Sequence, residues 1–302
     1  MTHPLGELRA LETDDGSLSL HSAHFGEAFH SSSGALAEAI AKFVRPAELD
    51  RFSQADELKV LDVCFGLGYN SAALMSALPC TNAPRMLWWG LELDQRPLTR
   101  ALDHKPFCDL WPPAVLNRLE QLRRTGSWND CAGQGTMAWG DARLNLKDLP
   151  DSCKPDLVLL DAFSPSRCPQ LWSEEFLAGL TDRLAPGGRL LTYCTAAAVR
   201  SSLRRAGLEL RSLLTAAHKL EKWSSGTLAA KQSEKGSLAV EGPGWTALSA
   251  MEEEHLQTRA SVPYRDPDGE DEAGMIQHRR KLEQDCCDLE STSAWQRRWR
   301  DH

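Results

Sequence analysis

Short apolar runs alternate along the chain with longer stretches in which apolar residues recur at helical spacing. The short runs are typical of buried strands, and the longer stretches are typical of helices that bury one face. Serine or proline opens several helical stretches, and proline or paired glycines close them. We predict seven strands, at residues 58–65, 86–93, 135–142, 154–163, 189–195, 208–214 and 226–231. We predict helices at residues 31–46, 66–78, 95–107, 112–124, 173–188, 196–207, 248–260 and 273–290.

The alternation of strands and helices indicates crossover connections and therefore a mainly parallel sheet. The last two strands, 208–214 and 226–231, have no long helix between them, so we expect the final strand to run antiparallel. The sequence thus predicts an α/β fold with a doubly wound, mainly parallel, seven-stranded sheet. A chain of 302 residues can hold one such domain and an extension. Because the pattern changes after Gly236, we divide the chain into a domain at 1–240 and an acidic, partly helical C-terminal extension at 241–302.

The composition is that of an ordinary soluble globular protein, with 42% hydrophobic and 25% charged residues. No stretch approaches the ~20 apolar residues needed to cross a bilayer, and the first residues do not resemble a secretory signal. We therefore expect a cytoplasmic protein without a membrane partner. The nine cysteines are scattered and odd in number, which favours reduced thiols over a disulfide framework or a metal site.

The net charge of −8 is unevenly distributed. Residues 241–302 contain fourteen acidic and eight basic residues, a net of −6, so the other 240 residues carry only −2. This balance argues against indiscriminate nucleic-acid binding but leaves room for local attraction. The candidate contacts are Arg167, a basic helix with Arg200, Arg204 and Arg205, and a terminal cluster of Arg297, Arg298 and Arg300 beside Trp295 and Trp299. A solvated face would show the same pattern.

Three strand ends carry groups suited to an adenosine. In an open parallel sheet, ligands bind outside the carboxyl ends of the strands. Gly66 and Gly68 follow the first strand and permit close backbone approach, although a plain strand–helix turn would also use them. Glu92 ends the second strand and can accept both ribose hydroxyls, and Asp141 ends the third and can accept from the adenine amine. No Lys-Ser/Thr pair follows the glycines, so a P-loop is excluded and S-adenosylmethionine is indicated, on the doubly wound methyltransferase fold.

Asp161 ends the fourth strand, which in such a fold faces the sulfonium methyl group. A primary aliphatic amine has a pKa of ~10 and is mostly protonated at neutral pH, so it needs a group that holds it and takes or relays its proton. A carboxylate at this position can do both. Phe163 could stack on a base, and Pro165 and Pro169 would limit the disorder of the loop. The alternative is that Asp161 only caps the next helix or closes the strand.

Residues 25–226 resemble the methyltransferase family that completes 5-methylaminomethyl-2-thiouridine at the wobble position of tRNA. This is the methyltransferase half of a bifunctional tRNA modification enzyme, which also occurs as a stand-alone protein. The resemblance rests on "FHSSSGALAEA", "FGLGYN", "PLTRAL" and above all "LLDAFSPSRCPQLW", followed by "APGGRLLTYCTAAAVRSSLRRAGL". It implies catalysis by Asp161, a cofactor loop at Gly66, Gly68 and Asn70, ribose and adenine acids at Glu92 and Asp141, and a methionine end near His30 and Ser31.

From these observations we expect the following site. Asp161 is catalytic, and no residue is expected to bind a metal. Cofactor contacts are expected from Asp62, Gly66, Leu67, Gly68, Asn70, Glu92, Asp141, His30 and Ser31. Substrate contacts are expected from Phe163, Pro165, Arg167 and Trp172.

The resemblance implies transfer of a methyl group from S-adenosylmethionine to the primary amine of 5-aminomethyl-2-thiouridine, with S-adenosylhomocysteine as the other product. The partner is then tRNA, at its anticodon wobble region. The chain departs from the family at Cys64, where glycine is more common and where the turn would be slightly wider. No part resembles the flavin-dependent oxidase half, so no flavin is expected, and a separate oxidase could supply the substrate.

Two other functions fit the same pattern. An aminopropyltransferase of the spermidine-synthase type also places an acid near a sulfonium, but its second acid beside the strand-four aspartate and its richer glycine loop are not evident here. A non-catalytic cofactor-binding or RNA-binding subunit could retain the fold. The set of Gly66, Gly68, Glu92, Asp141 and Asp161 weighs against it, because an inactive site has no physical need for all of them.

Overall fold

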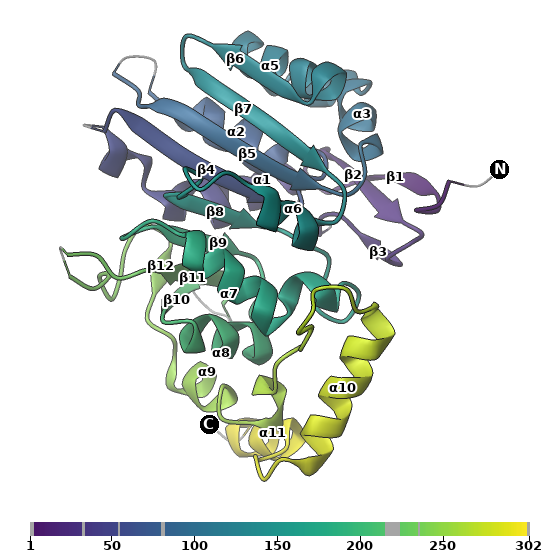
Figure 1. Cartoon of the computed structure of the whole chain (residues 1–302), viewed down its shortest axis with the longest axis vertical. Helices are drawn as coiled ribbons and strands as arrows, with labels where there is room; N and C mark the ends of the chain where they lie inside the picture. The colour runs from purple at the N-terminus through teal and green to yellow at the C-terminus, as the bar shows by residue number, and fades with distance from the viewer. Residues whose placement is uncertain are drawn as a thin grey trace.

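A nine-stranded sheet runs through the centre of the protein (Figure 1). The computed structural model describes residues 3–31, 34–53, 55–79, 82–214, 224–234 and 236–300. The order of the strands is β12-β10-β11-β9-β8-β4-β5-β7-β6. Their bounds are β4 Glu57–Val63, β5 Arg85–Glu92, β6 Ser127–Asp130, β7 Gly133–Trp139, β8 Leu157–Leu160, β9 Arg189–Thr192, β10 Glu209–Leu213, β11 Gly226–Ala230 and β12 Trp245–Thr246.

The predicted fold class is confirmed, because β4, β5, β7, β8 and β9 pair in parallel and helices cover the sheet. All seven predicted strands are present, and β11 runs antiparallel to both β9 and β10 as expected. The sheet has nine strands rather than seven because β6 and β12 each add an antiparallel edge. Both additions are short, and β6 has a single apolar side chain, that of Trp128, so neither showed a strand pattern in the sequence.

Helices pack on both faces of the sheet, and the side chains of each strand point alternately to one face and the other. In β8, Leu157 and Leu159 face one core, whereas Val158 and Leu160 face the other. The first face is covered by α1 Ala35–Ala39, α2 Tyr69–Ala77, α3 Arg96–Leu102, α4 Lys105–Cys108 and α5 Pro113–Thr125. The second is covered by α6 Ala142–Asp148, α7 Glu174–Arg183 and α8 Ala197–Arg205 (Figure 1).

The connections between strands reverse direction at β4. The chain proceeds from β4 outward to β5 and β7, and then returns to β8 on the other side of β4. Such a switch leaves a crevice at the carboxyl ends of the two central strands, where open α/β sheets bind their ligands. Both the glycine loop after β4 and Asp161 after β8 lie at this switch.

A small antiparallel sheet precedes the main one and was not predicted. It consists of β1 Leu8–Glu12, β2 Leu18–Ser22 and β3 Glu27–Ala28, and it lies beyond the end of the large sheet toward which β5 and β7 point (Figure 1). The predicted helix at 31–46 begins as α1 and continues as a π-helical turn, η1 Ile40–Val44, and a 3-10 turn, η2 Arg45–Ala47.

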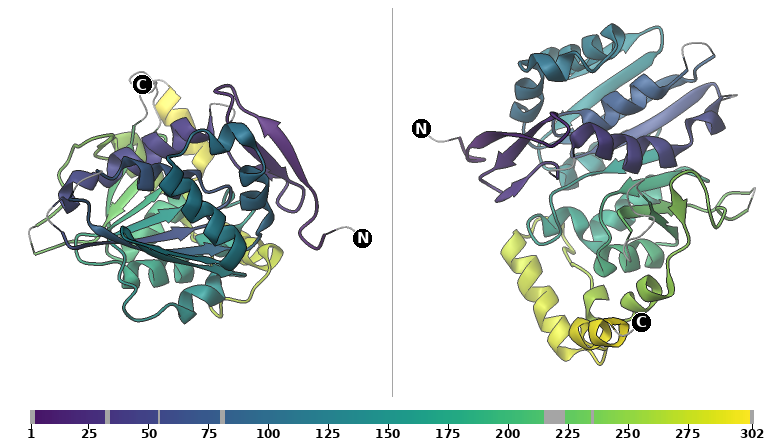
Figure 2. Two further views of the ribbon diagram at one scale, coloured as in Figure 1. Left: turned by 90° about the horizontal axis from the view of Figure 1, so that it is seen from above. Right: turned by 180° about the vertical axis from the view of Figure 1, so that it is seen from behind.

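The C-terminal residues pack against the helices of the second face (Figure 2). They form α9 Ala250–His255, a 3-10 turn η6 Arg259–Ser261, α10 Ala273–Cys286 and α11 Thr292–Arg300. Because β12 carries the sheet to residue 246, the division of the chain at residue 240 stays a prediction. Within the described ranges, no helix combines the length and the apolar character that a membrane crossing requires.

The basic residues of α8, which are candidate tRNA contacts, form ion pairs within the chain. Arg200 is buried and donates to Glu252 of α9, with Nη1 2.9 Å from Oε1. Arg204 and Arg205 form ion pairs with Glu253 and Glu174. Burial removes Arg200 from the candidate tRNA contacts. The paired side chains of Arg204 and Arg205 are 43% and 47% exposed, so a tRNA contact by these two residues stays a prediction.

The terminal basic cluster is also engaged in packing. Trp295 is buried and stacks on His255, with ring centroids 4.5 Å apart. Arg298 forms ion pairs with Glu254 and Glu290, and the Trp299 indole donates to Glu254. These contacts attach α11 to α9, so Trp295, Arg298 and Trp299 have a structural role. Arg297 is exposed, and its contact with tRNA stays a prediction.

Candidate active site

A cavity of about 510 Å³ opens at the carboxyl ends of β4, β5, β7 and β8, next to the switch in strand order. Its volume falls in the range of small-molecule and cofactor sites. The small N-terminal sheet and the π-helical turn η1 supply the remaining walls. The predicted site residues that line it are His30, Ser31, Gly66, Asn70, Glu92, Asp141, Asp161 and Phe163.

Glu92 and the glycine loop are held together at the ends of β5 and β4. The carboxylate of Glu92 accepts the Gly66 amide at 2.8 Å on Oε2 and the Asp94 amide at 2.8 Å on Oε1. Burial raises the pKa of Glu92, although these two amides favour the charged form. A Cβ at Gly66 would lie 3.3 Å from the Phe29 ring, so glycine keeps this part of the wall open. Both features suit a ribose lying against the loop.

Cys64 takes a backbone conformation that favours glycine. Its φ is 66°, in the left-handed region, where a side chain costs about 1–2 kcal/mol. The family resemblance places a glycine here more often, which would adopt this conformation without strain. The tight turn is therefore kept with a cysteine in place, and the thiol becomes part of the cavity wall.

Three of the predicted cofactor residues support the loop from behind. Asp62 is fully buried and accepts a hydrogen bond from the Ser71 hydroxyl, which in turn accepts from the Trp88 indole at 2.8 Å. Burial raises the pKa of Asp62 to about 7. Neither Asp62 nor Leu67 lines the cavity, and Gly68 serves as the left-handed N-cap of α2. A direct cofactor contact by buried Asp62 or Leu67, as expected from the sequence, does not fit this arrangement.

Asp161 lies directly after β8 with its carboxylate on the cavity. Its Oδ2 accepts the side-chain amide of Asn70 at 2.7 Å. Among the described residues, no second hydrogen bond to this carboxylate is formed, so Oδ1 can serve a ligand. Burial raises the pKa of Asp161 to about 6, against the favourable hydrogen bond from Asn70. The group is therefore mostly charged at neutral pH and still basic enough to exchange a proton.

An aromatic wall stands beside Asp161. Phe163 stacks on Phe25 with ring centroids 4.4 Å apart and meets the edge of Phe29 at 4.9 Å. Phe25 already covers one face of the Phe163 ring. A substrate base could therefore stack only on the part of this ring that Phe25 and Phe29 leave uncovered. Glu27 of β3 accepts both the amide and the hydroxyl of Ser164, at 3.0 and 2.9 Å. These contacts attach the small sheet to the loop that carries Asp161.

The other predicted substrate residues lie away from the cavity. Trp172 is fully buried, and its indole donates to the Phe163 carbonyl at 2.7 Å. A direct substrate contact by Trp172 is therefore excluded by its burial, and its role is to hold the loop. Pro165 is half-buried, and Arg167 is exposed beside Gly26 at the outer side of the same loop.

His30 and Ser31 line the opposite wall. The His30 ring packs edge-on against Tyr69 and lies 3.4 Å from the Ser19 hydroxyl. Burial lowers the pKa of His30 to about 4, so the imidazole is neutral near pH 7. The Ser31 hydroxyl donates to Glu38 at 2.8 Å. His30 and Ser31 therefore offer neutral hydrogen-bonding groups to a ligand. Ser31 also connects this wall to Glu38, which belongs to a charged pair that lines the cavity.

That charged pair, Glu38 and Lys42, was not identified from the sequence. The two side chains form an ion pair of 2.9 Å and both line the cavity. Oppositely charged residues four apart on a helix usually form a surface pair, so the spacing gave no reason to place them in a site. An acid beside a base can bind the ammonium and carboxylate of an amino acid, which matches the methionine end of the expected cofactor.

Asp141 is fixed by Arg143. Both oxygens of the Asp141 carboxylate accept from the guanidinium, the shortest contact being 2.7 Å from Nη2, and Oδ1 also accepts the Arg143 amide at 2.9 Å. Burial alone would raise the pKa of Asp141, but the hydrogen bonds and charge of Arg143 outweigh it and lower the pKa. Asp141 is therefore an anionic acceptor of fixed orientation.

The donor and acceptor set fits an S-adenosyl ligand. Glu92 would hold the ribose hydroxyls, Asp141 the adenine amine, and Glu38 with Lys42 the amino-acid end, with Asp161 beside the sulfur-bound methyl group. In the part of the chain that the structure describes, no group of three or more His, Cys, Asp or Glu side chains is arranged to hold a metal ion.

The chain matches a family model described as an S-adenosyl-L-methionine-dependent methyltransferase over residues 111–229. A bifunctional tRNA 5-methylaminomethyl-2-thiouridine biosynthesis protein, MnmC of Caulobacter sp. strain K31, is 31% identical over 204 residues, which is 63% of this chain and 33% of that protein. A crystal structure of MNMC2 from Aquifex aeolicus matches with a TM-score of 0.76 and 25% identity, over 95% of this chain and 88% of that one. The chain belongs to the MnmC methyltransferase-domain family.

Membership of the MnmC methyltransferase-domain family makes this chain an S-adenosylmethionine-dependent methyltransferase. An uncharacterized protein of Methanocaldococcus jannaschii is similar to it as well, at 31% identity over 64% of this chain and 52% of that protein. The chain thus spans about a third to a half of the length of these curated relatives. The match to MNMC2, by contrast, extends into most of residues 241–302.

Proposed function

We propose that this chain methylates the primary amine of 5-aminomethyl-2-thiouridine at the wobble position of tRNA. The observation that carries the proposal is the carboxylate of Asp161, which faces the cavity at the switch in strand order and is held there by Asn70. The MnmC relatives are named for the biosynthesis of 5-methylaminomethyl-2-thiouridine in tRNA, and an aminomethyl precursor presents the amine that such a carboxylate would bind.

Each cavity residue has a separate task in this reaction. When bound, S-adenosylmethionine supplies a methyl group activated by its positively charged sulfur. Asp161 binds the substrate ammonium, orients its nitrogen and accepts or relays one proton, so that a lone pair becomes available for attack. Asn70 prevents the carboxylate from turning away, and the phenylalanine wall excludes water from the reacting groups. No metal or flavin takes part in this scheme.

The test is methyl transfer to tRNA that bears 5-aminomethyl-2-thiouridine. The purified chain should move labelled methyl from S-adenosylmethionine to this tRNA. Asp161→Asn should reduce turnover by about a hundredfold or more, the usual effect of losing a positioned acid–base group, while S-adenosylhomocysteine still binds. In the unaltered chain, kcat/KM should fall as the pH drops below about 6, because Asp161 becomes protonated.

Three results would contradict the proposal in different ways. Full activity of Asp161→Asn would remove Asp161 from its catalytic role. Formation of a polyamine from decarboxylated S-adenosylmethionine and a diamine would favour the aminopropyltransferase. Absence of S-adenosylhomocysteine binding in calorimetry would favour a non-catalytic subunit.

The proposed cellular setting follows from the same substrate. We expect the chain to work in the cytoplasm on tRNA whose wobble uridine already carries an aminomethyl group, supplied directly or by a separate oxidase that removes a carboxymethyl group. Mass spectrometry of wobble uridines from cells that lack the protein would identify the precursor. Accumulation of the carboxymethylaminomethyl form would indicate that this oxidase is absent or acts later.

A further inference from the structure

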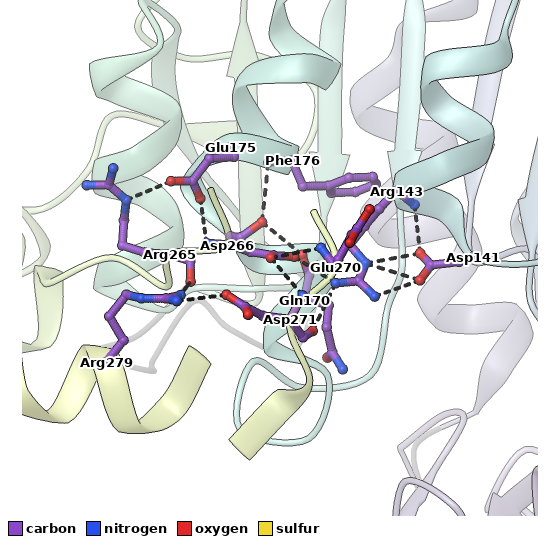
Figure 3. A network of polar contacts seen from close by, with 11 residues as sticks. Asp141, Arg143, Gln170, Glu175, Phe176, Arg265, Asp266, Glu270, Asp271 and Arg279 are labelled. Carbon is purple, nitrogen blue, oxygen red and sulfur yellow. Dashed lines mark hydrogen bonds and ion pairs between the residues drawn. The ribbon is translucent and has the colours of Figure 1, made fainter. Parts of the chain in front are cut away.

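A buried acid of the C-terminal segment reaches the adenine side of the cavity through one arginine. Figure 3 shows Arg143 between Asp141 and Asp266. The guanidinium binds both oxygens of Asp141 with its Nε and Nη2 atoms, and its Nη1 donates to Asp266 Oδ2 at 2.7 Å. Nη1 also donates to the carbonyl of Asp271 at 3.0 Å. Arg143 is thus held from two sides, by the end of β7 and by a segment more than a hundred residues away.

Asp266 is built into its position. Its side chain has 0% exposed surface. Its Oδ1 accepts the amides of Glu270 and Asp271 at 3.2 and 3.1 Å, while its own amide donates to Glu175 of α7 at 2.8 Å. A carboxylate with these partners has one orientation, and a buried carboxylate is costly unless it is paired. The free energy of its burial therefore depends on the charge of Arg143.

The loop that carries Asp266 is anchored to two helices. Arg265 donates to Glu175 of α7 at 2.7 Å, and Arg279 of α10 donates to Asp271 at 2.8 Å (Figure 3). The loop does not line the cavity itself. Its effect on a ligand must pass through Arg143, which does line the cavity together with Asp141.

We propose that Asp266 is a positioning residue for adenine recognition: by anchoring Arg143 it fixes the Asp141 carboxylate that accepts the exocyclic amine. The proposal rests on the cofactor assignment made above. Hydrogen bonds between charged groups in fixed geometry favour one orientation. Without the charge of Asp266, only the Asp271 carbonyl would hold the far side of the guanidinium, which would then fix the Asp141 carboxylate less firmly. The docked C-terminal segment would accordingly support the cofactor site, although its loop at residues 265–271 does not line the cavity.

The decisive measurement compares two ligands that differ at the exocyclic amine and at the hydrogen on the neighbouring ring nitrogen N1. Calorimetry is performed with S-adenosylhomocysteine and with S-inosylhomocysteine, in which a carbonyl replaces the amine. Asp266→Asn should weaken S-adenosylhomocysteine binding about fivefold, the value of one hydrogen bond, and leave S-inosylhomocysteine binding unchanged. The matched control is Asp285→Asn, an exposed acid of α10 paired with Lys281, which should change neither affinity.

The outcomes separate this role from a purely structural one. A general loosening of the site by Asp266→Asn would weaken both ligands alike and would overturn the proposal, as would unchanged binding of both. Failure of the unaltered chain to bind S-adenosylhomocysteine would instead reject the cofactor assignment.

A second measurement needs no variant and covers the case in which Asp266→Asn does not fold. Because coupling between two sites is reciprocal, S-adenosylhomocysteine should slow hydrogen exchange of the amides in residues 265–271 of the unaltered chain. S-inosylhomocysteine at equal saturation should slow it less. Equal protection by the two ligands, or no protection by either, would refute the role of Asp266.

Discussion

Burial raises the pKa of three carboxyl groups around the cofactor cavity, those of Asp62, Glu92 and Asp161. Each lies at or near the end of a central strand, where the surrounding side chains are apolar and the charged form is poorly solvated. All three accept hydrogen bonds inside the protein, but only Glu92 and Asp161 line the cavity. The catalytic carboxylate of the proposed reaction is therefore also a source of instability in the empty site.

Asp161→Asn should stabilise the protein at pH 8 by about 1–2 kcal/mol, because the neutral amide avoids the cost of burying a charge. The native carboxyl holds its proton up to a pH of about 6, above the ordinary value of 3.8, so its contribution to stability is present at low pH and is lost as the pH rises through 6. The gain in the variant should accordingly vanish below about pH 4. Urea unfolding of the variant and of the unaltered chain, at pH 8 and at a pH just below about 4, measures this gain in the free energy of unfolding.

Asp109→Asn is the control for this prediction, since the exposed Asp109 pairs with Lys105 on the surface. It should leave the unfolding free energy within about 0.5 kcal/mol at either pH. A destabilised Asp161→Asn at pH 8 would show that the hydrogen bond to Asn70 outweighs the burial of the charge.

The residues at strand ends could be predicted, because a polar group directly after an apolar run has few structural explanations. Asp141 and Asp161 are of this kind, and both line the cavity. Lys42 could not be predicted, because its position depends on a π-helical turn that gives no clear signal in the sequence. Arg200 was misread for the opposite reason: a basic residue on a helix gives no sign that an acid fifty residues later will bury it.

At the scale of elements, the turn between β4 and α2 sets the shape of the cofactor site. Gly68 has a φ of 94° and caps α2, and a Cβ there would lie 2.8 Å from the ring of Phe65. Gly68→Ala should therefore cost about 1–2 kcal/mol of stability, from backbone strain and from displacement of the ring. Its affinity for S-adenosylhomocysteine should fall as well, because the loop moves.

Gly274→Ala is a suitable comparison, because Gly274 lies in the first turn of α10 with open space around its Cα. Alanine should be neutral or stabilising there by up to about 1 kcal/mol. Thermal unfolding of both variants tests the pair, and equal midpoints would contradict the role given to Gly68.

The strands of the central sheet were predictable because short, nearly continuous apolar runs between helical stretches are typical of buried strands. The small N-terminal sheet was not, since four of the five residues of β1 are exposed and no buried alternation marks it. Its β2 is buried on most positions, but five residues without a clear partner give a weak signal. The part of the chain that closes the cavity was thus the hardest to anticipate.

At the scale of the whole molecule, a buried ion pair attaches the C-terminal segment to α8. Glu252 accepts from Arg200 at 2.9 Å, from Ser224 at 2.6 Å and from Ser212 at 2.8 Å. The side chains of Arg200 and Glu252 are only 1% and 4% exposed. Loss of either partner leaves an uncompensated charge in the interior.

Glu252→Gln should therefore destabilise the protein by about 3 kcal/mol or more. Burial opposes the charge of Glu252, but Arg200 and the hydrogen bonds outweigh it and lower the pKa to about 2. The contribution of this group is present above its ordinary pKa of 4.5 and is lost as the pH falls toward 2, so the penalty of the variant should shrink in acid. Denaturant unfolding between pH 3 and 7 measures the difference.

Glu253→Gln is the matched control, because Glu253, the next acid along α9, pairs with Arg204 at the surface, where both side chains are more than 40% exposed. It should change the unfolding free energy by less than about 1 kcal/mol. Equal losses in the two variants would mean that burial does not distinguish the two pairs.

The thiol of Cys64 gives the strained turn after β4 a chemical consequence. A cavity that holds a sulfonium methyl group exposes its own walls to alkylation, and a thiolate is a far better nucleophile than an amine that must first lose a proton. Burial, reinforced by the nearby carboxylates, raises the pKa of Cys64 well above its usual value, so the sulfur stays protonated. The same burial that raises the pKa of Asp161 thus favours the neutral, less nucleophilic form of this thiol.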